Sequence, residues 1–198
     1  MGSNAFKDRA LAEIFKDGAK VIDIGGGLRA SGERNNRFDP RYAELIVGKD
    51  YAVLDKEDTY HPDIVGDIHA LPFPDASVDS LICIAVLEHV EDPFLAMNEM
   101  YRVLKPGGAL FLYVPFLFYY HPLKGYYDDY WRFTKDGIRL LAKRFSRCEI
   151  EPTRGAIETM LHLVPFLNRS AGQFVFLDRM LGKSRSDQTS GYQALCIK

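Results

Sequence analysis

The stretch VDSLICIAVLEHVEDPFLAMNEMYRVLKPGGALFLYV, residues 78–114, contains the clearest indication of the fold. It starts with the apolar run VDSLICI at 78–84 and finishes with ALFLYV at 109–114, and neither run alternates regularly with polar residues. Uninterrupted apolar runs of this length are typical of strands that are covered on both faces. The residues between them have the spacing of a helix, so the stretch predicts a strand, a helix and a second strand.

The helix in the middle of this stretch has recognisable ends. Asp92 and Pro93 supply an N-cap and a first-turn proline. The sequence Pro-Gly-Gly at 106–108 is expected to end the helix. Between these ends, one apolar stripe recurs at helical spacing and consists of Met97, Met100, Tyr101 and Leu104.

The rest of the chain repeats this alternation of apolar runs and helical segments. Further strand-like runs are KVIDI at 20–24, YAVLD at 51–55, RCEIE at 147–151 and GYQALCI at 191–197. Helices are expected after Thr134, around Ile157 and near 174–181, because apolar residues recur there at helical spacing. Strands that alternate with helices predict an α/β fold with a doubly wound sheet.

Length and composition limit the possible classes of protein. The chain has 198 residues, of which 47% are hydrophobic and 26% charged, as expected for one folded domain. Its net charge of -2 gives no reason to expect a nucleic-acid-binding face. The N-terminal residues lack the apolar core of a secretion signal, and the apolar stretch from Ala109 is too short to span a bilayer. We therefore expect a cytoplasmic protein without a membrane span.

The three cysteines, Cys83, Cys148 and Cys196, lie far apart in strand-like runs. Their spacing indicates neither a zinc site nor a disulfide framework. We expect all three to be reduced residues of the core. The five histidines also show no metal-ligand spacing, so no metal is expected.

A glycine turn follows the first strand, in KVIDIGGGLR at 20–29. Such a turn allows backbone amides to approach a ligand closely. Gly25 and Gly27 match the first two glycines of a dinucleotide-binding fingerprint, but Ala30 stands at the third position. The turn therefore supports nucleotide binding only weakly, and a tight turn without a ligand is the alternative.

Two acids follow later strands of the predicted sheet. Asp55 ends the second strand, where its carboxylate can accept hydrogen bonds from ribose hydroxyls. Asp67 lies in VGDIHALPF at 65–73, after a third strand that is expected between 55 and 67. At Asp67 the carboxylate can meet an adenine amino group while Ile68 packs on the ring. Taken alone, Asp55 has the alternative explanation of a solvated loop acid, and Asp67 that of a turn cap. Together with the glycine turn they mark the carboxyl ends of successive strands, where α/β sheets bind ligands.

The run LPFPDASVDSLICIAVLEHVEDPFLAMNEMYRVLKPGG, with VIDIGGG upstream, resembles class I S-adenosylmethionine-dependent methyltransferases of the type 11 group. The similarity extends over about residues 20–150. It implies a Rossmann-like, doubly wound, mostly parallel seven-stranded sheet with helices on both faces. It also implies one domain over 1–198, with an N-terminal helix in 1–19, a cofactor-binding core in 20–115 and an acceptor-side segment in 116–198.

The resemblance also implies which residues hold S-adenosylmethionine. They are Asp23, Gly25, Gly26 and Gly27 in the glycine turn, Asp55 and Lys56 at the ribose, Asp67 and Ile68 at the adenine, and Ala85, Leu87 and His89 beside the methionine. Arg29 stands where the family usually has a small residue.

A second resemblance concerns VPFLFYYHPLKGYYDDYWRFTKDGIRLL, whose core is DYWRFT at 129–134. It is similar to the segment after strand five in type 11 enzymes of polysaccharide and glycoconjugate synthesis. It implies methyl transfer, by in-line displacement, to an oxygen of a small-molecule or glycoconjugate acceptor. Those relatives have His just before the core, whereas this chain has Asp128 there and His121 seven residues earlier.

Oxygen acceptors benefit from a general base. His121 is the first candidate, and Asp128 and Asp129 are its rivals. Aromatic residues of 116–131 are expected to line the acceptor pocket, since aromatic faces suit sugars and the sulfonium charge. The group includes Phe118, Tyr120, Tyr127, Tyr130 and Trp131. Arg132 either binds an anionic acceptor or forms an ion pair with a neighbouring Asp.

Several alternatives stay open. They are an N-, quinone or lipid methyltransferase of the same fold, a NAD-dependent oxidoreductase, and a protein that binds the cofactor without turnover. The chain is expected to be a monomer or homodimer without a nucleic-acid partner. The apolar helices in 156–181 are expected to cover the sheet, although a dimer face or a membrane contact would also explain them.

Overall fold

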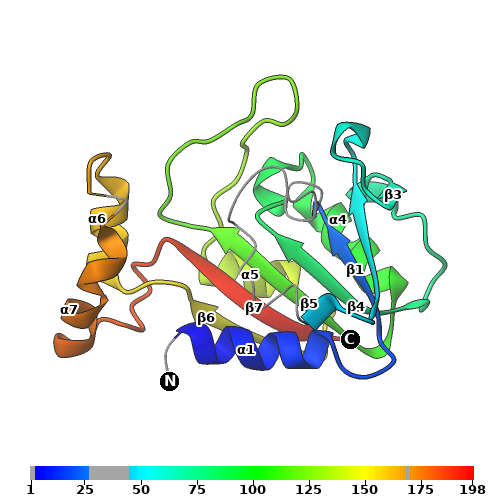
Figure 1. The fold of residues 1–198 in the computed structure, drawn as a ribbon, viewed down its shortest axis with the longest axis horizontal. Helices are drawn as coiled ribbons and strands as arrows, with labels where there is room; N and C mark the ends of the chain where they lie inside the picture. Colours follow the sequence, from blue (N-terminus) through cyan, green and yellow to red (C-terminus); the bar gives the residue numbers. More distant parts are fainter. Residues whose placement is uncertain (1–2, 27–44, 168–169) are drawn as a thin grey trace.

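Figure 1 shows the computed structural model, in which residues 3–26, 45–167 and 170–198 are described. A seven-stranded sheet runs through it in the order β3-β2-β1-β4-β5-β7-β6. The strands are β1 Lys20–Ile24, β2 Asp50–Asp55, β3 Ile64–Val65, β4 Val78–Ile84, β5 Leu104–Pro115, β6 Arg147–Pro152 and β7 Gly191–Ile197. Neighbouring strands among β1 to β5 are parallel, whereas β7 is antiparallel to β5 and β6. The predicted mostly parallel seven-stranded sheet is confirmed.

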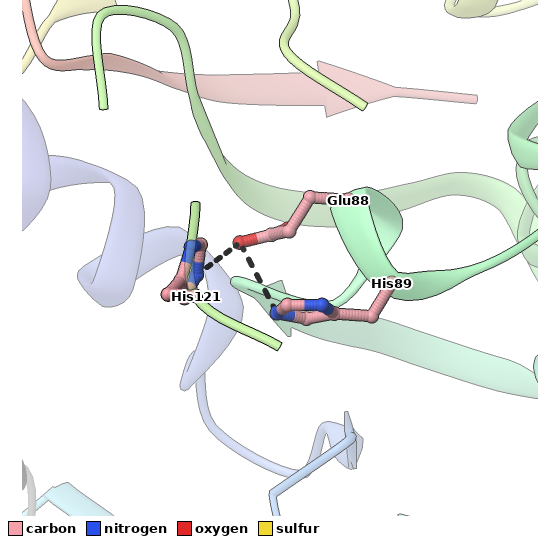
Figure 2. A group of neighbouring side chains, drawn as sticks. All are labelled: Glu88, His89 and His121. Atoms are coloured by element: carbon pink, nitrogen blue, oxygen red, sulfur yellow. Dashed lines mark ion pairs between the residues drawn. The ribbon is translucent and has the colours of Figure 1, made fainter. Parts of the chain in front are cut away.

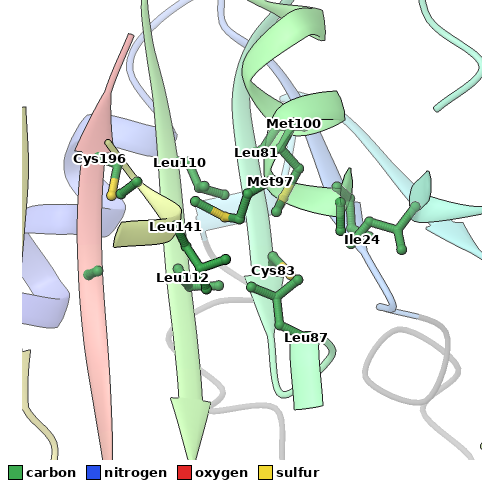
Figure 3. Close-up of a cluster of buried hydrophobic side chains, with 14 of the residues drawn as sticks. Ile24, Leu81, Cys83, Leu87, Met97, Met100, Leu110, Leu112, Leu141 and Cys196 are labelled. Carbon is green, nitrogen blue, oxygen red and sulfur yellow. The ribbon is translucent and has the colours of Figure 1, made fainter. Parts of the chain in front are cut away.

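Different helices cover the two faces of the central strands. α1 (Ser3–Ile14) packs on the face that includes Ile82 and Phe111. α4 (Pro93–Val103) and α5 (Lys135–Leu141) pack on the other face, together with Leu81 and Leu110 (Figure 3). Successive strand residues point to opposite faces, and here both faces are buried. This double burial explains why β4 and β5 are apolar without alternation.

α4 starts as predicted and ends earlier than predicted. The Asp92 carboxylate accepts hydrogen bonds from the N–H groups of Phe94 and Leu95, both at 3.0 Å. The helix ends at Val103, because Leu104 already pairs with Val78 of β4. Pro-Gly-Gly at 106–108 therefore lies within β5 and does not end the helix.

The helices after β6 form a separate hairpin beside the edge of the sheet (Figure 1). It consists of α6 (Ala156–Leu163), η4 (Ala171–Phe174) and α7 (Val175–Met180). The buried Asp178 carboxylate accepts hydrogen bonds from Ile157 and Glu158 N–H and so joins α7 to the start of α6. The hairpin lies beside the sheet and not over one of its faces, so the prediction that these helices cover the sheet is wrong. Met160 and Met180 are exposed on it. Within the described residues, no helix is both long and apolar enough to cross a membrane.

The cysteines differ from the prediction. Cys148 and Cys196 face each other across β6 and β7 and are joined in a disulfide. Cys83 is a free, buried thiol, as expected. The prediction of three reduced cysteines is therefore wrong for two of them, because the sequence does not reveal which strands pair.

An ion pair on α4 anchors the segment that follows β3. The Glu99 carboxylate accepts the Leu71 N–H at 3.0 Å and two guanidinium N–H groups of Arg102, at 2.8 and 2.7 Å. Arg102 also donates to the carbonyl oxygens of Leu71 and Phe73, at 3.0 and 2.8 Å. The Arg102 guanidinium holds the pKa of Glu99 below its usual value. This network connects α4 to the residues just after Asp67.

We expect Glu99→Gln to lower the free energy of unfolding by about 1–2 kcal/mol at pH 7, since it removes a charged hydrogen-bond acceptor that solvent partly screens. The contribution is complete above the unfolded-state pKa of about 4.3 and is lost as the pH falls through the lowered folded-state pKa. Denaturant titrations at pH 7 and pH 3 check this. The exposed Glu91→Gln is the control, and an equal effect of both variants at pH 7 would contradict the anchor.

Candidate active site at the carboxyl edge of the sheet

The glycine turn after β1 leaves no room for side chains. Gly25 has a φ of +67°, and its N–H donates to the Leu54 carbonyl at 2.7 Å. A Cβ placed on Gly26 would lie 2.8 Å from Cγ of Asp23. Asp23 itself is buried beneath the turn and accepts a hydrogen bond from the Tyr51 hydroxyl at 2.8 Å. The turn is thus tightly packed from below. Gly27, Arg29 and Ala30 lie outside the described residues.

The ends of β2 and β3 place three predicted cofactor residues near one another. Asp55 is half-buried at the end of β2, and its carboxylate accepts the Glu57 N–H at 3.1 Å. The exposed Lys56 ammonium lies 3.4 Å from Oδ2 of Asp67. Lys56, which follows Asp55 in the chain, therefore forms an ion pair with Asp67 across the ends of β2 and β3.

Asp67 caps the short helix η2 (Ile68–Ala70). Its Oδ1 accepts the backbone N–H of His69 and lies 2.8 Å from Nδ1 of the same residue. Partial burial opposes the ionised form, but the hydrogen bonds from His69 outweigh it and lower the pKa of Asp67. Ile68 is buried in the core. The turn-cap interpretation of Asp67 is thus correct for one carboxylate oxygen, and Oδ2 faces Lys56.

The end of β4 meets the glycine turn. Ala85 has a φ of +55°, a conformation that non-glycine residues rarely adopt, and its N–H donates to the Tyr113 carbonyl at 3.0 Å. The next residue, Val86, packs against Gly25. Leu87 was predicted to lie beside the methionine of the cofactor. In the structure its side chain is fully buried in the core and has no surface accessible to a ligand. The strained backbone at Ala85 redirects the chain into η3 (Leu87–His89).

Glu88, His89 and His121 converge above this edge (Figure 2). Glu88 has 1% of its surface exposed, and its Oε1 lies 3.9 Å from Nε2 of His89 and 4.0 Å from Nε2 of His121. The two imidazole rings meet edge to face at 5.0 Å. Burial lowers the pKa of His89, so its neutral form is favoured. We call these three residues the EHH cluster.

The EHH cluster is held by the loop between β5 and α5. The His89 Nδ1 lies 2.7 Å from the Asp128 carbonyl oxygen. The His121 Nδ1 lies 3.2 Å from Oδ2 of Asp129 and 3.0 Å from the Tyr119 carbonyl oxygen. Each imidazole therefore turns its Nδ1 toward oxygen acceptors and its Nε2 toward Glu88. Sequence reasoning missed Glu88, whose only visible signal was its place beside His89 after an apolar strand.

An Arg132–Asp129 pair organises the same loop. The Asp129 carboxylate is fully buried and accepts two guanidinium N–H groups, at 2.6 and 2.7 Å, and the backbone N–H of His121 at 2.8 Å. Arg132 lowers the pKa of Asp129 to about 2, although burial opposes the shift. The other N–H groups of Arg132 donate to the carbonyl oxygens of Phe118, Tyr119 and Trp131. The ion-pair interpretation of Arg132 is therefore correct, and its guanidinium is engaged within the protein.

The remaining predicted residues lie on the outside of the loop. The exposed Asp128 carboxylate accepts the Tyr130 hydroxyl at 3.1 Å, and the Trp131 indole donates to the Val90 carbonyl at 2.8 Å. Tyr120 is 73% exposed. Two other aromatic rings lie nearer to the EHH cluster: Tyr127 at 4.2 Å from His89 and Phe118 at 5.1 Å from His121. Of the aromatic residues expected around the acceptor, Phe118 and Tyr127 are therefore in ring contact with the EHH cluster.

A cavity of about 1080 Å³ lies elsewhere, among α1, β6 and α7. Charged side chains that line it pair with each other, as Arg9 does with Glu149 and Arg154 with Glu158. Pockets that bind small organic ligands are lined mainly by apolar and aromatic side chains. Among the described residues that line this cavity, charged side chains predominate instead. The carboxyl edge of the sheet is therefore the better candidate.

We expect Asp129→Asn to lower the free energy of unfolding by on the order of 3 kcal/mol, because it leaves the partly buried Arg132 without its counter-charge. The neighbouring Asp128→Asn is the matched control, with an effect within about 0.5 kcal/mol, since its carboxylate is exposed. Chemical denaturation of the three proteins checks this. Equal stability of the two variants would show that the ion pair does not organise the loop.

Known proteins resemble this chain in both sequence and fold. A family model described as "Methyltransferase domain" matches residues 30–112. The ubiquinone/menaquinone biosynthesis C-methyltransferase UbiE of Paraburkholderia phymatum is 32% identical, over 85% of this chain and 78% of that protein. UbiE of Neisseria meningitidis is 37% identical over 59% of this chain and 50% of its own length. The chain thus spans about half the length of several curated relatives that it matches.

Solved structures agree on the fold. A SAM-dependent methyltransferase from Archaeoglobus fulgidus covers 99% of this chain with a TM-score of 0.61 at 15% identity, and this chain covers 94% of it. One from Mesorhizobium loti covers 99% with a TM-score of 0.58 at 15% identity, and this chain covers 98% of it. Together with the Paraburkholderia relative, these matches show that the chain belongs to the class I S-adenosylmethionine-dependent methyltransferases, in the type 11 group.

Proposed function

We propose that this chain transfers a methyl group from S-adenosylmethionine to an oxygen of a small-molecule or glycoconjugate acceptor that binds at the EHH cluster. The observation that supports this most is the position of the cluster. Glu88 and His89 of the cluster lie in η3, shortly after the end of β4. Val86, between β4 and η3, packs on Gly25 of the glycine turn. A donor held at that turn and an acceptor held at the cluster would be neighbours, as in-line displacement requires.

The carboxyl edge has the features that this cofactor needs. Gly25 and Gly26 carry no side chains of their own, so the turn can pass close to a bound ligand. We propose that Asp55 accepts the ribose hydroxyls and that Oδ2 of Asp67 faces the adenine amino group. Ala85 keeps the end of β4 free of a large side chain. When bound, the sulfonium supplies an electrophilic methyl group.

We propose His121 as the proton acceptor for the acceptor hydroxyl in the metal-free protein. Its Nδ1 is oriented by Asp129 and the Tyr119 carbonyl, which leaves Nε2 directed into the EHH cluster. Asp129 is then a positioning residue, and Asp128 positions His89 through its backbone carbonyl. Tyr127 and Phe118 exclude water from the two imidazoles, whereas Tyr120, Tyr130 and Trp131 contact the outer part of the acceptor.

A quinone ring is the second candidate acceptor, because the curated relatives are named as quinone C-methyltransferases. The aromatic rings around the EHH cluster suit a flat ring as well as a sugar. The two candidates differ in the atom that is methylated. Mass spectrometry with fragmentation of the product separates O- from C-methylation. The cytoplasmic location stays a prediction.

We expect Asp55→Ala to weaken S-adenosylhomocysteine binding at least tenfold, because a charged hydrogen-bond partner worth about 1.5 kcal/mol is lost. Isothermal calorimetry measures the change, with the exposed neighbour Asp58→Ala as the control. Wild-type protein that binds NAD but no S-adenosylhomocysteine would refute the cofactor assignment.

We expect His121→Gln to lower the turnover of a hydroxyl acceptor by 10²–10⁴-fold, as loss of a general base does, with S-adenosylhomocysteine affinity unchanged. A radiolabelled methyl-transfer assay with panels of sugars and quinols provides the measurement. His162→Gln, which removes another imidazole near Phe118, serves as the control. Unchanged turnover in His121→Gln would exclude this histidine from the reaction.

A further inference from the structure

We infer that Glu88, His89 and His121 form a binding site for a divalent transition-metal ion. One ligand atom from each residue lies within 4.8 Å of the others. The carboxylate comes from a buried position in η3, and His121 comes from a loop more than thirty residues away. Only the fold brings them together (Figure 2). The inference rests on the proposed function in one respect, since it assigns the site the task of holding the acceptor oxygen.

The hydrogen bonds around the cluster orient the imidazoles as in metal sites. A carbonyl oxygen can only accept, so His89 donates its Nδ1–H to Asp128 at 2.7 Å. The His121 Nδ1 likewise faces two oxygen acceptors, at 3.0 and 3.2 Å, whereas the Arg132 Nη2 is more distant at 3.5 Å. In the neutral form of each imidazole, the Nε2 then carries the lone pair that is directed into the cluster. Histidines that bind metals typically donate their other N–H to a carbonyl or carboxylate in this way.

The distances suit a metal ion. Around a tetrahedral ion with bonds of about 2.0–2.2 Å, two ligand atoms lie roughly 3.3–3.6 Å apart. The Glu88 Oε1 lies 3.9 and 4.0 Å from the two Nε2 atoms, so the side chains must rotate inward by a few tenths of an ångström to close the site.

The donor set indicates the class of metal. Two imidazoles and one carboxylate suit Zn²⁺, Mn²⁺ or Fe²⁺, whereas Mg²⁺ and Ca²⁺ prefer sites made only of oxygen. Three protein ligands leave coordination positions open, as in catalytic rather than structural sites. An acceptor hydroxyl in an open position would lose its proton to solvent more readily. In the metal-bound protein, His121 would be a ligand and not the general base. The metal ion would then favour deprotonation of the acceptor hydroxyl.

The first experiment measures metal binding without cofactor or acceptor. The full chain, free of any histidine tag and treated with a chelator, is titrated with MnCl₂ under electron paramagnetic resonance and with ZnCl₂ in a calorimeter. We expect one equivalent to bind, and we expect His121→Gln and His89→Gln to weaken it at least 100-fold. Both substitutions lie at partly accessible positions, and circular dichroism verifies folding. His162→Gln and His61→Asn are the controls and should bind normally.

The outcomes separate the site from the proposed function. Absence of Mn²⁺ and Zn²⁺ binding at millimolar metal, or equal loss in His162→Gln, overturns the metal site. In that case a loss of methyl transfer in His121→Gln still supports the general base. Stoichiometric metal binding that depends on His89 and His121 supports the metal site, whether or not a hydroxyl acceptor is methylated. Failure to methylate any hydroxyl acceptor would count against the proposed function alone.

Discussion

The need to bury both faces of the central strands governs the arrangement of this molecule. β1, β4 and β5 are covered by α1 on one side and by α4 and α5 on the other. Parallel strands buried in this way must be joined by crossovers, and their carboxyl ends then share one edge. The glycine turn, Asp55 and Ala85 are neighbours for that reason alone. The location of the candidate site is thus a consequence of how the core is packed.

The polar chemistry of this edge depends on a second constraint, the closure of the loop between β5 and α5. Arg132 binds Asp129 and the carbonyl oxygens of Phe118 and Tyr119, so one guanidinium connects both arms of the loop. The same carboxylate accepts the backbone N–H of His121 and faces its Nδ1. A residue that looked suitable for binding an anionic acceptor instead positions the histidine. Arg132 stabilises the loop and does not bind a ligand, because its guanidinium N–H groups donate to acceptors within the loop.

The EHH cluster combines burial with convergence of acceptor atoms. Glu88 is almost completely buried, and each neighbouring imidazole has its Nδ1 hydrogen-bonded away from the cluster. Lone pairs that meet at one point favour a positive charge between them, whether a proton or a metal ion. The proposed base and the proposed metal site are two uses of the same electrostatic property. They differ in what occupies the centre.

The sequence by itself determined the strands other than β3, the α/β class and the family. Uninterrupted apolar runs identify buried strands, and the Asp92–Pro93 cap is a local signal that the structure reproduces. The end of α4 was placed too late, because pairing of Leu104 with β4 overrides the local glycine signal.

Tertiary structure alone decided which distant side chains meet. The contact of His121 with Glu88, the pairing of Cys148 with Cys196 and the displacement of the α6–α7 hairpin to the sheet edge have no local signature. Local periodicity reports how a residue relates to its neighbours within a turn or two, whereas these contacts depend on loop paths and strand order. Those are set by the packing of the whole chain.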